Sequence, residues 1–245
     1  MRSVRLGAAV ALLALVAAGC ALANPWPDVP PTTPDAHHVL LLGDSLMGGT
    51  ATLLPGLMRD VTFYDEHRNG SGLVGQLDGV EPVDFFEAQL QEHPDVDTVV
   101  FEWAGACANP CPIGYGSLDF YAKWTSTMVA LRDAAVAHGL AVLWVVPPPP
   151  PPEAAAADGP FVFTPDTSTT LSNLTRWFRD VTLVDWWSAL SDTGGAYQQT
   201  LFYGLFDPPA LHQVRADDRI HLSIDGAFRT SWWTMAALRG KWVAP

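Results

Sequence analysis

Two short segments near opposite ends of the chain carry residues that could do acyl chemistry. Ser45 follows an apolar run at 39–43 and precedes a helical stretch, so its hydroxyl is expected where a strand ends near a helix N-terminus. Asp218 lies three residues before His221, close enough for the carboxylate to orient one imidazole nitrogen. The other nitrogen could then accept the serine proton, which makes the hydroxyl a nucleophile. The pattern predicts a covalent acyl-enzyme.

Each of these residues also has an ordinary structural explanation. A serine in a turn commonly caps the following helix, and Asp218 and His221 could be a capping carboxylate and a surface imidazole. Asp44, just before the serine, either organises the loop through hydrogen bonds or caps the next helix. The local sequence leaves these alternatives open.

Strands and helices alternate along the chain. Continuous Val and Leu runs predict strands that are covered on both faces, and stretches of helical pattern separate them. The expected strands lie at 39–43, 97–103, 140–146 and 181–187, with a weaker one at 61–66. The expected helices lie at 118–138 and 223–238, with shorter ones at 49–59, 81–92 and 168–179.

This alternation predicts an α/β protein, a three-layer α/β/α sandwich around a parallel sheet of about five strands with right-handed crossovers. One domain, residues 38–245, accounts for all of these elements. Ligands of doubly wound sheets bind beyond the carboxyl ends of the strands, and Ser45 follows the first strand at that end.

The segments GDSL at 43–46 and DRIHLS at 218–223 resemble the first and last blocks of the GDSL or SGNH esterase family. The resemblance covers about residues 38–240. Members of that family have a flavodoxin-like sandwich and hydrolyse esters, thioesters or carbohydrate O-acyl groups, and some transfer acyl groups. The resemblance implies that Ser45 is the nucleophile, His221 the base and Asp218 its orienting partner, with no cofactor.

Two further segments are similar to the family blocks that build the oxyanion hole. The glycine block matches residues 69–72, with Gly72 as first choice and Gly70 as second, although these glycines could simply serve a turn. In the third block, Ala106 stands where the family usually has asparagine. Loss of one oxyanion donor costs about 10²–10³ in turnover. Either Asn109 supplies the missing donor, or the hole has backbone donors alone.

The first 23 residues have the order of an export signal. Arg2 and Arg5 precede an uncharged apolar run. Cys20 ends a segment that resembles a bacterial lipobox, which predicts lipidation, whereas a small-x-small site predicts cleavage before Asn24; an uncleaved membrane helix is the third alternative. Residues 24–37 are rich in proline and are expected to form an extended tether.

With Cys20 lipidated or removed, Cys107 and Cys111 are the remaining cysteines. They lie in one loop of a chain expected in an oxidising compartment, which predicts a disulfide. A structural zinc site is the alternative, but two cysteines without a nearby histidine are too few for it. The sequence contains neither a phosphate-binding glycine loop with lysine nor a His-x-x-x-His helix, so no motif points to another cofactor or a metal.

Composition limits the partners. The chain has 245 residues, of which 49% are hydrophobic, which excludes a disordered protein, and its net charge of −13 disfavours nucleic-acid binding. The proline run 147–152 is expected to be a polyproline II excursion that serves as a rigid surface connector. The many tryptophans could stack on sugars, but most fall on predicted core elements.

The sequence therefore predicts an exported serine hydrolase, a surface lipoprotein or a secreted protein, that acts on a small ester or an acylated carbohydrate. Membrane contact is expected only through a lipid anchor on Cys20. Two alternatives stay open: an acyltransferase with the same three residues, and a non-catalytic carbohydrate-binding surface protein, for which Ala106 is the motivating departure.

Overall fold

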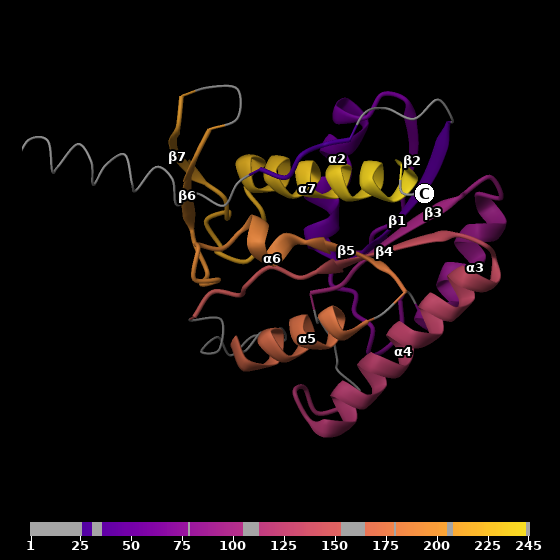
Figure 1. The fold of residues 1–245 in the computed structure, drawn as a ribbon. Helices are drawn as coiled ribbons and strands as arrows, with labels where there is room; N and C mark the ends of the chain where they lie inside the picture. The colour runs from indigo at the N-terminus through magenta and orange to yellow at the C-terminus, as the bar shows by residue number, and fades with distance from the viewer. Residues whose placement is uncertain are drawn as a thin grey trace, which may run out of the picture.

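A parallel five-stranded sheet forms the centre of the molecule, with strand order β2-β1-β3-β4-β5 (Figure 1). The computed structural model describes residues 26–30, 36–77, 79–104, 113–152, 165–178, 180–204 and 208–243. The strands of the sheet are β1 (His37–Gly43), β2 (Val61–Asp65), β3 (Thr98–Glu102), β4 (Ala141–Val146) and β5 (Thr182–Asp185). The predicted α/β class and the parallel sheet of five strands are confirmed.

Helices cover both faces of this sheet (Figure 1). In chain order they are α2 (Ser45–Leu57), α3 (Pro82–Glu92), α4 (Leu118–Ala137), α5 (Pro165–Trp177), α6 (Trp186–Ala189) and α7 (Ile224–Val243). Helices α2, α6 and α7 lie on one face, and α3, α4 and α5 lie on the other. Among the described residues, no helix is both long enough and apolar enough to cross a membrane.

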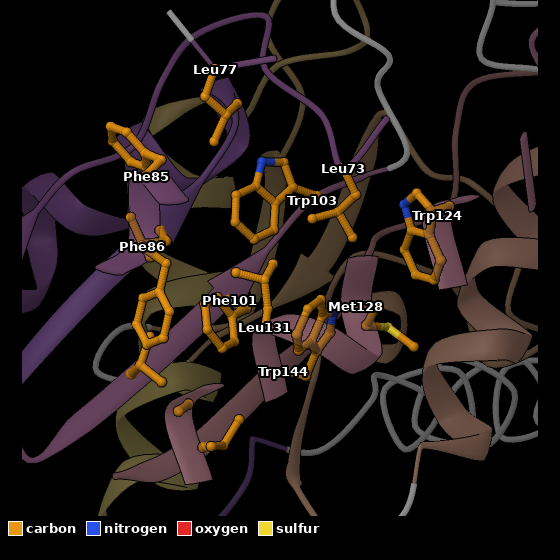
Figure 2. Packing of buried hydrophobic residues seen from close by; sticks show 14 of the residues in the cluster. Leu73, Leu77, Phe85, Phe86, Phe101, Trp103, Trp124, Met128, Leu131 and Trp144 are labelled. Atoms are coloured by element: carbon orange, nitrogen blue, oxygen red, sulfur yellow. The ribbon is translucent and has the colours of Figure 1, made fainter. Parts of the chain in front are cut away.

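The strands alternate their apolar side chains between two core layers. Leu40 and Leu42 of β1 face α3 and α4, whereas Val39 and Leu41 face α2 and α7. Figure 2 shows the first layer, which is rich in aromatic rings. The tryptophans predicted to pack in the core include three that are fully buried: Trp103, Trp144 and Trp186. Burial on both faces explains why the strands appear in the sequence as continuous apolar runs.

Several predicted boundaries differ from the observed ones by two to five residues. The strand expected at 181–187 ends at Asp185, whose side chain caps the short helix α6 by accepting the N–H of Ser188 at 3.1 Å. The helix expected at 49–59 begins earlier, at Ser45, because Asp44 caps it there. The last helix extends five residues beyond the predicted end at 238, to Val243.

An antiparallel hairpin lies beside the sheet at its carboxyl edge and was not predicted. It consists of β6 (Thr200–Tyr203) and β7 (Ala210–Gln213). The hairpin packs against the start of α7, where His212 Nδ1 lies 3.1 Å from Asp225 Oδ2. Both of its strands have four residues, too few for a clear alternation of apolar and polar side chains.

Part of the proline-rich segment lies against the domain. Residues 26–30 have no regular secondary structure, as their prolines predict, but Trp26 packs edge-on against Tyr203 and Trp232. The guanidinium of Arg229 lies 4.7 Å from the centre of the Trp26 ring. At these five residues the segment is docked on α7 and β6 and does not run free as a tether.

The proline run after β4 is also not a surface connector. Pro147, Pro148, Pro149 and Pro151 are buried at the carboxyl edge of the sheet. Hydrogen bonds hold this segment at two carbonyl groups: Ser172 Oγ donates to Pro147, and Arg215 Nη2 donates to Pro149. The prediction failed because prolines remain apolar and can be buried wherever other groups satisfy their carbonyl oxygens.

One close backbone approach gives a test of the packing. A Cβ at Gly226 in α7 would lie 1.9 Å from the Val214 carbonyl oxygen, whereas a Cβ at Gly240 in the same helix would meet nothing within 4 Å. We expect Gly226→Ala to lower the free energy of unfolding by about 1–3 kcal/mol. Gly240→Ala, the matched control, is expected to raise it by up to about 1 kcal/mol. Urea unfolding measures both, and equal effects would contradict this packing.

Candidate active site

Ser45 is the first residue of α2, immediately beyond the end of β1. Asp44 ends the extended backbone and caps the helix, because its Oδ1 accepts the N–H of Leu46 at 2.9 Å. Gly43 pairs with Glu102 in the sheet, so β1 and β3 end level with each other. The serine hydroxyl therefore lies at the positive end of the helix dipole, at the carboxyl edge of the sheet.

Asp44 joins two strand ends. Its other carboxylate oxygen, Oδ2, accepts the N–H of Ala104 at 3.1 Å, and the side chain is buried. The two roles considered for Asp44 from the sequence, organiser of the loop and helix cap, are both present. The same carboxylate therefore fixes the turn of Ser45 relative to the segment that follows β3.

The turn at 216–222 presents His221 and Asp218 as a pair. Asp218 Oδ2 lies 2.5 Å from His221 Nδ1, and Oδ1 accepts the N–H groups of Ile220 at 3.0 Å and His221 at 2.9 Å. Partial burial disfavours ionisation of Asp218, but the hydrogen bonds from His221 and Ile220 outweigh it and lower the pKa of the carboxyl. Asp218 is thus held as an acceptor for the Nδ1–H of His221.

His221 meets Ser45 across the active-site edge. His221 Nε2 lies 2.9 Å from Ser45 Oγ, although the two residues are 176 positions apart in the chain. With Nδ1–H donated to Asp218, Nε2 is the free acceptor for the serine proton. The structure brings together the three residues that the sequence singled out, in the geometry of a nucleophile, a base and an orienting carboxylate.

A left-handed residue and a tyrosine shape this turn. Arg219 has a φ of 67°, a conformation that residues other than glycine rarely adopt. The Tyr197 hydroxyl donates to the Arg219 carbonyl at 3.1 Å, and the N–H of Ala216 donates to the His221 carbonyl at 2.9 Å. These bonds hold the turn closed, so the strained residue keeps His221 directed at Ser45.

Arg215 also supports this turn through hydrogen bonds. The sequence analysis did not predict that role. Its Nη1 donates to the Ile220 carbonyl and its Nη2 to the Pro149 carbonyl, both at 2.8 Å. Burial lowers the pKa of Arg215 to about 10, against the opposing effects of Tyr197 and Asp218, so the side chain is charged at neutral pH. It links the turn at 216–222 to the proline segment after β4. No sequence signal marks it, since an arginine before Ala-Asp-Asp is expected on the surface.

The glycine loop after β2 lies against the turn of Ser45. Ser71 Oγ and the Arg68 N–H both donate to the carbonyl of Gly43, two residues before the serine. Gly70 has a φ of 71°, a conformation that glycine adopts easily. It therefore serves the turn, which is one of the two roles that the sequence left open for it. Gly72 is buried in the same loop, and its role as an oxyanion donor stays a prediction.

Several predicted residues lie outside the described part of the chain. These are Cys20, Ala106, Cys107, Asn109 and Cys111. The predicted lipidation, the predicted disulfide and the donor role of Asn109 therefore stay predictions. Among the described residues, no group of three or more His, Cys, Asp or Glu side chains is placed to hold a metal ion.

A small pocket of about 20 Å³, open to solvent on one side, lies beside this site. Ala104, which bonds Asp44, and Ile220, which precedes His221, form part of its wall. The remaining lining residues are Pro148, Pro149, Pro150, Pro151, Ser168 and Arg215. Apart from Ser168 and Arg215, the side chains around this space are apolar.

Comparison with models of known protein families assigns the chain to one family. A family model described as "Protein of unknown function (DUF459)" matches residues 38–231. The chain belongs to the DUF459 family. The matched region begins in β1 and ends in α7, so it spans the whole sheet and the Ser45, Asp218 and His221 positions. No curated protein matches the sequence.

Solved structures with the fold of this DUF459 chain include proteins named as SGNH hydrolases or as members of the G-D-S-L family. TesA matches with a TM-score of 0.55 at 16% identity, over 84% of this chain and 99% of its own. A protein from Desulfitobacterium hafniense, named as lipolytic and of the G-D-S-L family, gives 0.60 at 11% identity, over 82% and 98%. A variant of Axe2, an acetyl-xylooligosaccharide esterase from Geobacillus, gives 0.53 at 13%, over 85% and 97%. The expected SGNH hydrolase fold is confirmed.

The lowered pKa of Asp218 predicts a pH dependence of stability. A carboxyl with a depressed folded-state pKa stabilises the fold above its unfolded pKa of about 3.9, and this contribution disappears as pH falls through the folded value. We expect Asp218→Asn to lower the free energy of unfolding at neutral pH and to flatten its loss on acidification.

Asp217→Asn is the matched control, since Asp217 bonds Gln213 at 3.2 Å and not His221. Denaturant unfolding between neutral pH and pH of about 3 measures the three proteins. If acidification lowered the free energy of unfolding equally in wild type and in Asp218→Asn, the assigned hydrogen bonds of Asp218 would be contradicted.

Proposed function

We propose that this DUF459 chain is a serine hydrolase that cleaves ester bonds through an acyl-enzyme on Ser45. The observation that carries the proposal is the relay in which His221 Nε2 lies 2.9 Å from Ser45 Oγ while Nδ1 contacts Asp218. A cap or a surface histidine needs one of these contacts, whereas nucleophilic catalysis needs both. The shared fold with SGNH hydrolases supports the same reaction class.

The reaction follows from the relay in two halves. Ser45 Oγ attacks the carbonyl carbon of the ester as its proton moves to His221 Nε2, and the Asp218 carboxylate stabilises the imidazolium. Collapse of the tetrahedral intermediate breaks the bond to the alcohol oxygen, which takes the proton from Nε2. Water then attacks the acyl-enzyme with His221 as base, and the carboxylic acid leaves with Ser45 regenerated.

The negative oxygen of the intermediate needs hydrogen-bond donors. We propose backbone N–H groups at the start of α2 and in the glycine loop, with Gly72 as the first choice. The helix dipole of α2 adds to their effect because its positive end is at Ser45. Asn109 stays the candidate for a side-chain donor in place of the asparagine that Ala106 replaces.

The small size of this pocket favours a short acyl group as the part of the substrate held beside Ser45. Its wall is formed largely by proline rings and by Ala104 and Ile220, which suit a small apolar group. The Axe2 variant with the same fold is an acetyl-xylooligosaccharide esterase, which agrees with acetyl esters of carbohydrates as the first substrates to test. An acidic protein with a net charge of −13 favours neutral substrates over polyanions.

Turnover of short p-nitrophenyl esters tests the proposal. We expect Ser45→Ala and His221→Ala to lower kcat by about 10⁴–10⁶-fold, because each removes a member of one cooperative unit. Ser126→Ala is the matched control, since Ser126 is an exposed residue of α4 whose hydroxyl donates to the Lys123 carbonyl of the same helix. It is expected to keep wild-type turnover.

Two results would count against the proposal. Wild-type turnover in folded Ser45→Ala would assign the activity to another residue. Failure of the folded wild type to hydrolyse p-nitrophenyl esters and acetylated oligosaccharides would favour the carbohydrate-binding alternative, which binding of unmodified oligosaccharides then tests.

We propose export as well, on the order of charged and apolar residues in segment 1–23. Mass spectrometry of the N-terminus after expression in a bacterial host tests this. A diacylated Cys20 or a new terminus at Asn24 is the expected result, and it also decides between lipid anchoring and free secretion. A protein of unchanged mass that retains Met1 would contradict export.

A further inference from the structure

A second carboxyl group lies buried beside the turn that carries Ser45. It makes no contact with His221 or Asp218 in the proposed relay. Glu102 is the last residue of β3 and is fully buried. Its Oε2 accepts the N–H of Asp44 at 3.3 Å, and a Cβ at Gly43 would lie 2.8 Å from the same oxygen. The absence of a side chain at Gly43 therefore leaves the space that this carboxyl occupies.

Glu102 and Asp44 share one buried site. Like charges so close and so far from water cannot both ionise. Burial raises the pKa of Glu102 well above its ordinary value, and the charge of Asp44 raises it further. Burial raises the pKa of Asp44 as well, but the N–H groups of Leu46 and Ala104 oppose this effect by stabilising its charged form, so the shared proton resides on Glu102.

The hydrogen bonds of the pair agree with this assignment. Glu102 Oε1 receives no hydrogen bond from any N–H or O–H group of the described residues. A charged oxygen in that position would carry the full cost of desolvation, whereas a neutral carboxyl does not. A protonated Glu102 can donate a hydrogen bond to the carboxyl group of Asp44, and such a bond favours the charged form of Asp44.

We propose that Glu102 is a positioning residue: a neutral carboxylic acid that donates its proton to the Asp44 carboxylate and so holds the turn that carries Ser45. Asp44 in this orientation bonds both Leu46 and Ala104. Without the donor, the buried carboxylate turns toward other N–H groups, and Ser45 shifts relative to His221. The catalytic part of this proposal rests on the proposed hydrolase function.

Two substitutions separate the hydrogen bond from the packing. Glu102→Gln keeps the shape and a side-chain donor but cannot ionise, whereas Glu102→Leu keeps an apolar group of similar size without a donor. We expect Glu102→Gln to keep wild-type kcat. Glu102→Leu is expected to lower kcat by about 10²-fold with KM little changed, since sub-ångström misplacement acts on the transition state.

The kcat of the folded protein separates positioning from a purely structural role. Leucine leaves the buried Asp44 N–H without its acceptor, so Glu102→Leu is expected to unfold at a lower urea concentration than wild type. A purely structural role would end there and leave kcat unchanged in the folded variant without urea. Wild-type kcat in Glu102→Leu, or a kcat in Glu102→Gln as low as in Glu102→Leu, would overturn the proposal.

Infrared spectroscopy reports the proton directly and needs no turnover. The difference spectrum between wild type and Glu102→Gln at neutral pH is expected to contain the C=O stretching band of a protonated carboxylic acid. A spectrum without that band overturns the assignment, even if Glu102→Leu does not fold. Because this measurement does not depend on ester cleavage, failure of the proposed hydrolase function and failure of the Glu102 assignment are distinguishable.

Discussion

The constraint on which the site depends is the burial of the Asp44 carboxylate. Carboxyl oxygens buried away from water must receive hydrogen bonds, and the donors here are backbone N–H groups from two separate strand ends, at Leu46 and Ala104. The two hydrogen bonds hold the carboxyl ends of β1 and β3 together and fix the start of α2. The serine hydroxyl then lies at a helix N-terminus, 2.9 Å from His221 Nε2.

The histidine side of the relay is organised by a different principle, a short turn held from outside. Arg215 reaches the carbonyl of Ile220, and Tyr197 reaches that of Arg219, so the turn keeps a left-handed residue that it would not otherwise adopt. Close contact between Gly226 and the Val214 backbone sets the turn on α7. The proposed nucleophile and the proposed base thus come from opposite ends of the chain.

Much of this arrangement was predictable from the sequence. Apolar runs identified the strands because both sheet faces are covered, and parallel strands bring their carboxyl ends to one edge, where Ser45 and His221 meet. The hairpin β6–β7 was missed because its strands are short. Arg215 and the buried proline run were missed because their burial depends on tertiary hydrogen bonds. Glu102 did leave a signal, a carboxylate at the end of an otherwise apolar strand.

The central claim is that an acyl group passes through Ser45, and trapping that intermediate tests it most directly. The protein is mixed with p-nitrophenyl acetate, the reaction is quenched in acid during the first turnover, and peptide mass spectrometry locates any acetyl group. The account predicts one acetyl group on the peptide that contains Ser45, lost with time as water attacks. Turnover of the ester with no acetyl adduct, or with the adduct on another residue, would contradict it.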